Sequence, residues 1–534
     1  MMKDGSDFMT FDFILRGGTV IDGSGNAPFC ADVAIKNGKI AAVGQLGAAD
    51  AAQTLDAAGF CVTPGFLDIH RHGDTAVFRE DFGIAELRQG LTSVLNGACG
   101  LSVAPFGEAH RQELEHYLLP VTGDLDPAIP THSIGAYLDA LRAKKLRLNA
   151  GMMVGGGTLR ADLCGYRQEA PEDFSALHRR LETALSEGAR AVSLGLGYAP
   201  ECFYSTDELI AALSPLQNGQ IPIAVHMREE GDAVCEAIAE MVTVAKALNC
   251  PLHISHLKAM GMRNWRKRIP TALKMMQRAR DEGVDLTCDV YLYEAGSTQL
   301  LHLLPPDFLV GGTEVISERL RVPAEREKLR ERIQNGRDFD NIAQMIGWDN
   351  IRLSTMRLPE YQPLIGKTIT EAAELLRLDP VDCLCRVLSD EHCAVTMIDR
   401  INCEDDICEI LCDPYAAVIS DATYPVRGLP HPRVYGNVTR LFERFVRDKG
   451  VLTLTEAVRK VTSLPADAMR LTGKGRLAVG MDADVNVFRL EDLHECATYL
   501  APRQESLGMD TVLVGGVPAI LHGELTGAKN GSVI

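Results

Sequence analysis

The sequence lacks the features that would place the protein in a membrane or on nucleic acid. No window approaches ~18 consecutive apolar residues without a charge, so we expect no membrane-spanning helix. The N-terminal stretch MMKDGSDFMTFDF has acidic residues and no apolar h-region, so we expect no secretory signal. Basic residues are outnumbered, since 54 lysines and arginines against 72 aspartates and glutamates give a net charge of −18. This balance argues against nucleic acid or an anionic membrane surface as the main partner.

The composition is that of a large globular protein without repeats or low-complexity tracts. Its 534 residues are 46% hydrophobic and 24% charged. At about 150 residues per domain this length would give three or four domains, although a single α/β barrel often takes about 250 residues. The 15 cysteines are scattered and no export signal is expected, so we predict reduced thiols and a cytoplasmic location.

Both ends of the chain have the texture of β-structure. Residues 11–15 alternate along the chain, and Asn37-Gly38 joins two short alternating runs, which is a strong hairpin signal. Near the other end, Gly515-Gly516 separates two runs of the same kind. The two ends are therefore predicted to be β-rich, unlike the middle.

The middle of the chain alternates short apolar strands with amphipathic helices. One helix start is marked by the capping-box pair Ser205 and Glu208. Eight strands separated by helices favour an α/β fold of the (β/α)8 TIM-like type over an open sheet. A long connection follows the seventh strand, and its charged helical portion around 298–350 is typical of a lid-like insertion. The predicted strands are residues 65–70, 92–97, 149–155, 190–195, 221–226, 251–256, 284–290 and 416–420.

Residues that can bind a metal lie where these strands end. His70 and His72 share one face at the end of the first strand, because side chains alternate along a strand. This pair alone is equally compatible with two partly exposed polar histidines. Other strand ends carry residues of similar chemistry, and in a barrel such ends meet at the face where catalytic residues gather. These residues are Cys99, His226, His256 and Asp421.

The chemistry of this set indicates a zinc hydrolase. Imidazole and thiolate suit zinc better than magnesium or calcium, which prefer oxygen ligands. Zinc lowers the pKa of a water ligand to about 7 and so supplies hydroxide at neutral pH. Asp421 would take a proton from the attacking water and return it to the leaving nitrogen. The residues therefore predict metal-assisted hydrolysis of an amide or a related bond.

Longer motifs carry a family resemblance. The runs ILRGGTVIDGSG, TPGFLDIHRH and GRLAVGMDADVNVF resemble the amidohydrolase superfamily, which implies a barrel plus a small β-sandwich built from both chain ends. On this basis we expect a discontinuous small domain at 1–63 and 473–534 and a catalytic barrel at 64–472. A closer match is to the N-acyl-D-amino-acid deacylases, or D-aminoacylases. The motifs of that match are NGACG, HMREEGD, HISHLK, DVYLYEAGST, ISDAT and HPRVYGNVTR.

The resemblance implies a role for each predicted metal-site residue. His70 and His72 match the histidines of one metal position, while His226 and His256 match the ligands of the other. Cys99 matches the family's cysteine, which replaces the carboxylated lysine of hydantoinase-like relatives. One zinc is therefore expected to be held tightly by Cys99, His226 and His256, with a second position at His70, His72 and Cys99. Asp421 matches the catalytic aspartate.

The resemblance also implies a set of substrate-binding residues. In the family, two cationic side chains and several hydroxyl groups face the substrate's α-carboxylate and scissile bond, and one tyrosine lies at the rim of the active site. Arg427 competes with Arg433 for the second cationic role, and the motif favours Arg433. The implied residues are Lys258, Tyr291, Ser297, Arg433 and Tyr198.

Some residues depart from the family pattern or invite a plainer interpretation. Gly156 stands where relatives commonly carry histidine, and GNVTR after Arg433 replaces the more usual GTFPR. The first change puts the amino-acid preference in doubt. His253 is expected to pack in the core instead of binding a metal, His302 to be solvated or part of the lid, and Glu230 to orient His226 or form an ion pair.

The combined prediction is zinc-dependent hydrolysis of an N-acyl-D-amino acid to a carboxylate and a free D-amino acid. A hydantoinase or dihydropyrimidinase-like cyclic amide hydrolase is the alternative, although the strand RAVSLG offers no lysine for carboxylation. A non-catalytic metal-holding barrel is disfavoured by Asp421. The expected partner is a small N-acyl amino acid, with no nucleic acid and no membrane. The sequence leaves open the acyl group, the D-side chain, the metal count and the oligomeric state.

Overall fold

A computed structural model describes residues 11–425 and 427–534 and contains the predicted barrel. Its strands form two parallel sheets, with the orders β6-β7-β8 and β9-β10-β11-β12-β13-β17. Only Met153 separates β8 from β9, and a parallel bridge between Arg71 and Ala422 joins the first strand to the last. The strands are β6 (Phe66–Asp68), β7 (Leu91–Asn96), β8 (Asn149–Met152), β9 (Val154–Gly155), β10 (Val192–Gly195), β11 (Ile223–His226), β12 (Leu252–Ile254), β13 (Leu286–Val290) and β17 (Ala416–Val418).

Helices cover the outside of the barrel. The capping box predicted at Ser205 is present at the start of α6, where the Ser205 hydroxyl accepts a hydrogen bond from the Glu208 N–H. The barrel strands are almost entirely buried, as expected when helices cover their outer face. The helices are α1 (Ile84–Arg88), α2 (Arg111–Thr122), α3 (Ile134–Ala143), α4 (Gly156–Cys164), α5 (Ser175–Ser186), α6 (Thr206–Ala212), α7 (Val234–Leu248), α8 (Arg268–Asp281), α14 (Glu404–Cys412), α15 (Arg433–Arg440), α16 (Leu454–Lys460) and α17 (Ser463–Ala468).

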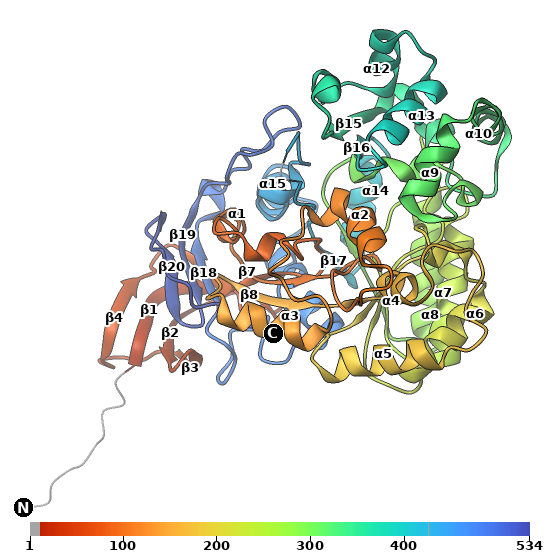
Figure 1. The fold of residues 1–534 in the computed structure, drawn as a ribbon. Coiled ribbons are helices and arrows are strands. Elements are labelled where there is room, and N and C mark those ends of the chain that lie inside the picture. Colours follow the sequence, from red (N-terminus) through yellow and green to blue (C-terminus); the bar gives the residue numbers. More distant parts are fainter. Residues whose placement is uncertain (1–10, 426) are drawn as a thin grey trace, which may run out of the picture.

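The two ends of the chain form one small β domain beside the barrel (Figure 1). Its nine strands share a sheet, in which β5 pairs antiparallel with β18. Asn37 and Gly38 both have positive φ angles in the predicted hairpin, as a two-residue turn of this kind requires. Residues 1–10 of the expected first segment lie outside the described residues. The strands are β1 (Phe11–Val20), β2 (Phe29–Lys36), β3 (Lys39–Gly44), β4 (Ala51–Asp56), β5 (Cys61–Pro64), β18 (Val485–Phe488), β19 (Met509–Val514), β20 (Val517–Leu521) and β21 (Glu524–Leu525).

The insertion after β13 is a folded unit larger than the predicted segment 298–350. A three-stranded antiparallel sheet of order β14-β16-β15 holds it together, with Gly296 of β14 paired to Asp399 of β16. The unit therefore extends to Asp399, because its first strand needs a partner about 100 residues later. Its elements are β14 (Gly296–Gln299), α9 (Gly312–Arg321), α10 (Pro323–Asn335), α11 (Ile342–Ile346), β15 (Ile351–Thr355), α12 (Ile369–Leu376), α13 (Pro380–Asp390) and β16 (Thr396–Asp399).

Within the described residues, no helix combines the length and the hydropathy needed to cross a bilayer.

Candidate metal centre and substrate cavity

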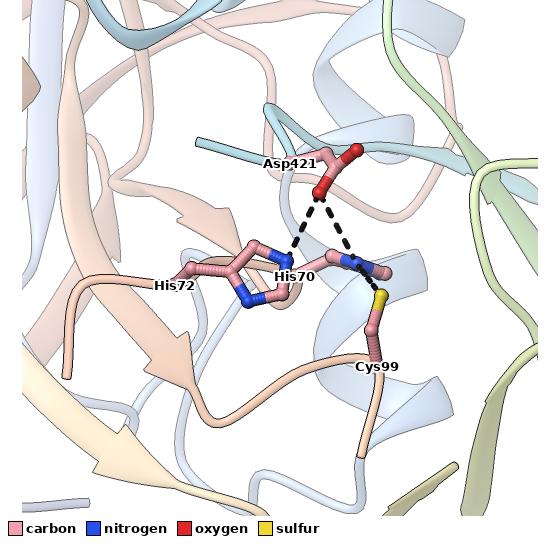
Figure 2. A group of neighbouring side chains, drawn as sticks. All are labelled: His70, His72, Cys99 and Asp421. Atoms are coloured by element: carbon pink, nitrogen blue, oxygen red, sulfur yellow. Dashed lines mark hydrogen bonds and ion pairs between the residues drawn. The ribbon is translucent and has the colours of Figure 1, made fainter. Parts of the chain in front are cut away.

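All six residues predicted from the strand ends come together at one end of the barrel. Their potential ligand atoms form two groups, and within each group the atoms lie within 4.8 Å of one another. Cys99 belongs to both groups, so its thiol lies between the two candidate metal positions. Every member is buried. The first group is His70, His72, Cys99 and Asp421, shown in Figure 2, and the second is Cys99, His226 and His256.

The distances fit a centre made of nitrogen and sulfur donors. Cys99 Sγ lies 3.2 Å from His70 Nε2 and 3.4 Å from His256 Nε2. His256 Nε2 is in turn 3.1 Å from His226 Nδ1. Imidazole nitrogens and a thiol directed at one another in this way offer the donor set that zinc prefers. The residues therefore fit a zinc ion, and Cys99 fits both positions.

Asp421 faces the same group with one oxygen and an arginine with the other. Its Oδ1 lies 3.2 Å from His72 Nε2 and 3.5 Å from His70 Nε2, as the dashed lines in Figure 2 show. Its Oδ2 lies 2.9 Å from Arg433 Nη1. The carboxylate is thus held in place from behind while its other oxygen faces the candidate metal group.

Three of the six residues have backbone conformations that side-chain-bearing residues rarely adopt. The φ angles are 54° at Cys99, 33° at His256 and 50° at Asp421. Such positions cost about 1–3 kcal/mol each and cluster at functional sites. In each case the chain turns sharply just after a strand, and the turn directs the side chain into the barrel mouth.

The glycines beside Cys99 allow close packing of neighbouring backbone. A Cβ at Gly97 would lie 2.4 Å from the Met153 carbonyl oxygen, and one at Gly100 would lie 2.8 Å from the Gly195 nitrogen. These glycines allow the Cys99 turn to pack against Met153, between β8 and β9, and against β10.

A layer of acidic residues orients the histidines from behind. Glu230, predicted for this role, has Oε1 2.9 Å from His256 Nδ1. Asp289 on β13 was not predicted, and it lies 3.4 Å from His70 Nδ1 and 2.8 Å from His253 Nε2. His253 is in neither ligand group of the described residues, which agrees with its expected core position. Carboxylates in this position fix the tautomer and orientation of a metal-binding imidazole.

The surroundings also set the charges of the key side chains. Burial alone would raise the pKa of the Cys99 thiol, but His70 and His256 outweigh it and hold that pKa well below its usual value. Burial likewise opposes ionisation of Asp421, yet Arg433 and His72 hold the pKa of its carboxyl well below the usual range. Both side chains are therefore favoured as anions, the forms that bind cations or accept a proton.

A cavity opens next to the two ligand groups. Four of the five predicted substrate-binding residues line it. Within this wall, Lys258 Nζ lies 2.6 Å from Glu230 Oε2, and the Tyr198 hydroxyl is 2.8 Å from Thr298 Oγ1. The four residues are Lys258, Tyr291, Ser297 and Tyr198.

Arg433, the fifth predicted residue, is completely buried and does not belong to the cavity wall. Its guanidinium lies 4.8 Å from the Tyr291 ring, and Nη2 donates to the Ser297 carbonyl oxygen at 3.1 Å. Arg433 reaches the site through its ion pair with Asp421, whose carboxylate balances the guanidinium charge. Its competitor Arg427 lines a separate surface depression with Thr355.

Two lining residues escaped sequence reasoning. His302, expected in a solvated lid, is half-buried, and its ring centroid is 4.9 Å from that of Tyr198. Asp399, the last residue of β16, is 1% exposed and lines the cavity. Both lie in the insertion, where no barrel pattern applies. The sequence offered one sign of Asp399, which is that this acidic residue ends the short apolar run TMID.

Gly156, which departs from the family pattern, is the first residue of α4 and is not part of the cavity wall. A Cβ at this position would lie 2.4 Å from Glu201 Oε1 and 2.9 Å from Leu194 Cδ2. Glu201 is buried, and its Oε2 accepts a hydrogen bond from the Gly195 N–H at 2.7 Å. The Glu201 carboxyl therefore fills the space that a side chain at 156 would need.

Known proteins similar to this chain agree with one another on the family. Residues 418–520 match a model described as the amidohydrolase family. The chain is 32% identical over 534 residues to a D-aminoacylase of Alcaligenes xylosoxydans xylosoxydans, covering 99% of this chain and 98% of that protein.

Two solved structures are similar over nearly the whole chain. The N-acyl-D-glutamate deacylase of Bordetella bronchiseptica, complexed with zinc and a phosphonate that mimics the tetrahedral intermediate, gives a TM-score of 0.82 at 28% identity, with 98% of this chain and 99% of that chain covered. A D-aminoacylase gives a TM-score of 0.81 at 28% identity with the same coverage. That protein is described as having a binuclear metal centre with one-metal activation and second-metal attenuation.

Proposed function

The chain belongs to the N-acyl-D-amino-acid deacylases of the amidohydrolase superfamily and is a metal-dependent amide hydrolase, and from this premise we propose that it uses zinc to release a carboxylate and a free D-amino acid from N-acyl-D-amino acids. The observation that carries the proposal is the position of Asp421. Its Oδ1 faces two candidate ligand histidines, and its Oδ2 is held by Arg433.

Cys99, His226 and His256 are the proposed ligands of the tightly held zinc, and His70 and His72 with Cys99 are those of the second position. When bound, zinc supplies a Lewis acid and a nucleophile at neutral pH. The related D-aminoacylase with one-metal activation supports a single essential ion. Asp289 and Glu230 keep the histidines oriented whether or not the second position is filled.

The proposed reaction moves one proton through Asp421. Its free oxygen accepts the proton of the attacking water as the new C–O bond forms at the amide carbon. The same oxygen then gives the proton to the nitrogen as the C–N bond breaks, which releases an amine and a carboxylic acid. The carboxylic acid loses the second proton of the water to solvent and becomes the carboxylate. Arg433 is a positioning residue, because its guanidinium fixes the other oxygen of Asp421.

The cavity wall supplies groups that suit the α-carboxylate of the substrate. Lys258 is the cation that reaches the wall, and the hydroxyl-bearing residues Tyr291 and Ser297 also line it. Tyr198 lines the same cavity beside His226, with ring centroids 4.5 Å apart. We assign the α-carboxylate to Lys258, Tyr291 and Ser297, and the acyl side of the substrate to Tyr198.

Replacing Asp421 by asparagine tests the reaction directly. The substitution keeps the shape and removes the proton acceptor, so turnover should fall by about 100-fold or more while zinc content and thermal stability stay near wild type. The matched control is Asp406→Asn, which alters a buried carboxyl on α14 outside the cavity wall. Wild-type turnover by Asp421→Asn would rule out the proposed proton transfer.

A substrate screen with zinc supplied tests the substrate class. Paired N-acetyl-D- and N-acetyl-L-amino acids should show cleavage of the D series alone. Hydantoins and dihydropyrimidines belong in the same screen, because they represent the cyclic-amide alternative. That alternative has no support in β10, which lacks a lysine. Preferential cleavage of the cyclic compounds would overturn the assignment.

A further inference from the structure

Asp399 is a buried carboxyl group that the proposed reaction does not use. It ends β16, pairs through its backbone with Gly296 of β14, and lines the cavity. Its side chain is 1% exposed, and Oδ1 has no hydrogen-bond partner among the described residues. Buried polar atoms without partners are rare in native proteins, and each one calls for an explanation such as an absent ligand.

The cations near Asp399 are already paired with other acids. Lys258 Nζ lies 2.6 Å from Glu230, and Arg433 Nη1 lies 2.9 Å from Asp421. Within the described ranges 11–425 and 427–534, Asp399 has no ion-pair partner within 4.0 Å. Burial raises the pKa of this carboxyl to about 6, although Lys258 and Arg433 oppose the rise. At neutral pH the cavity wall therefore presents a carboxylate that has no ion-pair partner within 4.0 Å among the described residues.

The cations of the insertion do not alter this balance. Arg330 pairs with Asp379 at 2.6 Å, and Arg332 pairs with Asp307 at 2.9 Å. The charged helices α9 and α10 contribute no residue to the cavity wall. Among the described residues no arginine lines the cavity to receive an acidic side chain, and Asp399 would repel one.

Apolar groups lie next to the carboxyl. The position that a Cβ at Gly296 would take is 2.7 Å from Ile401 Cδ1, 3.1 Å from Asp399 Oδ1 and 3.3 Å from the Tyr291 hydroxyl, so these three side chains border the same space. Met260 and Ile342 line the same cavity. Ile401 beside the Asp399 carboxyl, with two further apolar side chains in the same wall, suits a substrate side chain with an apolar stem and a charged end.

We propose that Asp399 binds a cationic side chain of the D-amino acid, so that N-acyl-D-arginine or N-acyl-D-lysine is preferred over neutral and acidic substrates. This inference rests on the proposed deacylase function and names its substrate class. It differs from the specificity of the N-acyl-D-glutamate deacylase to which the chain is similar. Asp399 is thus a specificity-determining residue supplied by the insertion, whereas the barrel supplies the reacting groups.

The test compares substrates that differ in charge but little in shape. The zinc-loaded enzyme is assayed with N-acetyl-D-arginine against N-acetyl-D-citrulline, and with N-acetyl-D-lysine against N-acetyl-D-norleucine. In each pair kcat/KM should favour the cationic member by at least about tenfold, as expected for a charged hydrogen bond. The larger of the two ratios tells whether guanidinium or ammonium fits better. In Asp399→Asn both ratios should fall close to one.

A control variant and a binding measurement complete the experiment. Asp349→Asn removes an exposed carboxyl from the same insertion and should leave the ratios unchanged. Free D-arginine should raise the melting temperature of the wild-type protein more than D-citrulline does, and this difference should vanish in Asp399→Asn. Equal kcat/KM within the pairs, or ratios that survive in Asp399→Asn, would overturn the inference. Failure of the deacylase function is distinct, because then no N-acetyl-D-amino acid is cleaved, and the binding comparison still decides the role of Asp399.

Discussion

Cys99 connects the two candidate metal positions, because its Sγ lies within 3.4 Å of a histidine from each ligand group. A thiolate shared in this way brings negative charge to both positions without an added carboxylate. Among the described residues it is the one cysteine in a ligand group. Its loss should therefore affect metal binding more than any other single cysteine substitution.

Cys99→Ala should lower the zinc content of the purified protein and reduce turnover by more than about 100-fold, since even the partners behind metal ligands are worth about 10- to 100-fold. Cys288→Ala is the matched control, because Cys288 is a fully buried cysteine on the barrel strand β13. It should keep its zinc and lose only some stability. Metal analysis of both variants decides the matter, and full zinc content in Cys99→Ala would contradict the assignment.

The unpaired Asp399 also predicts how stability changes with pH. Its pKa is about 6 in the folded protein against 3.8 for an unperturbed aspartate, so the folded state holds this proton more tightly. Its contribution to stability is therefore fully present below about pH 4 and is lost as the pH rises to about 6. Asp399→Asn does not lose this stability, because asparagine does not ionise. The variant should gain on the order of 1 to 3 kcal/mol relative to wild type between pH 4 and pH 7.

Denaturant unfolding of both proteins at several pH values measures this difference, and any shared loss of metal at low pH cancels in the comparison. A difference that stays constant across this range would show that folding does not raise the pKa of Asp399.

Residues that could be predicted from the sequence are positioned by local patterns, and most of those that could not be predicted are positioned by long-range contacts. His226 and Asp421 follow apolar runs directly, so the strand pattern alone placed them at the barrel mouth. Asp399 reaches the cavity through a pairing between β14 and β16 that no local pattern encodes. Asp289 lies within a barrel strand and was hidden by its buried neighbours, although a lone acid in such a strand implies a partner.

At the level of elements, the barrel strands were predictable and the insertion was not. Each barrel strand is a short apolar run between helices, a pattern that is repeated eight times. The insertion was expected from its charged helices around 298–350, but its sheet pairs β14 with β16 across five intervening α-helices and β15 with β16 across two. Hydrogen bonds also connect α15 to the barrel. Asn437 accepts a hydrogen bond from the Leu292 N–H and donates one to the Ile419 carbonyl oxygen. This asparagine lies in the GNVTR motif and joins the ends of β13 and β17.

The start of α4 gives a prediction for Gly156. Gly156→Ala should lower the free energy of unfolding by about 1 to 3 kcal/mol, because the added methyl group overlaps Glu201 and Leu194. The matched control is Gly107→Ala, whose Cβ would meet no atom closer than 3.6 Å. Thermal unfolding of the two variants compares them. Equal stability would mean that Glu201 moves away freely, which its hydrogen bond to Gly195 argues against.

At the scale of the whole molecule, the net charge of −18 opposes the approach of an anionic substrate. N-acetyl-D-methionine carries one negative charge, so its kcat/KM should rise with ionic strength, by roughly a few-fold, as salt screens the repulsion. N-acetyl-D-arginine is neutral overall and should show a nearly flat response. Steady-state rates at several sodium chloride concentrations test this. A fall for the methionine substrate would mean that local attraction by Lys258 dominates its approach.

The pairing of β5 with β18 has a consequence for how the protein is made. Thr63 and Asn486 are neighbours in the sheet but lie roughly 400 residues apart, so β5 emerges from the ribosome tens of seconds before its partner at typical rates of synthesis. During that interval one edge of the first half-domain is exposed while the barrel is still incomplete. The last strands made therefore close the small domain, and we expect a slow, late step in refolding that local helix formation does not limit.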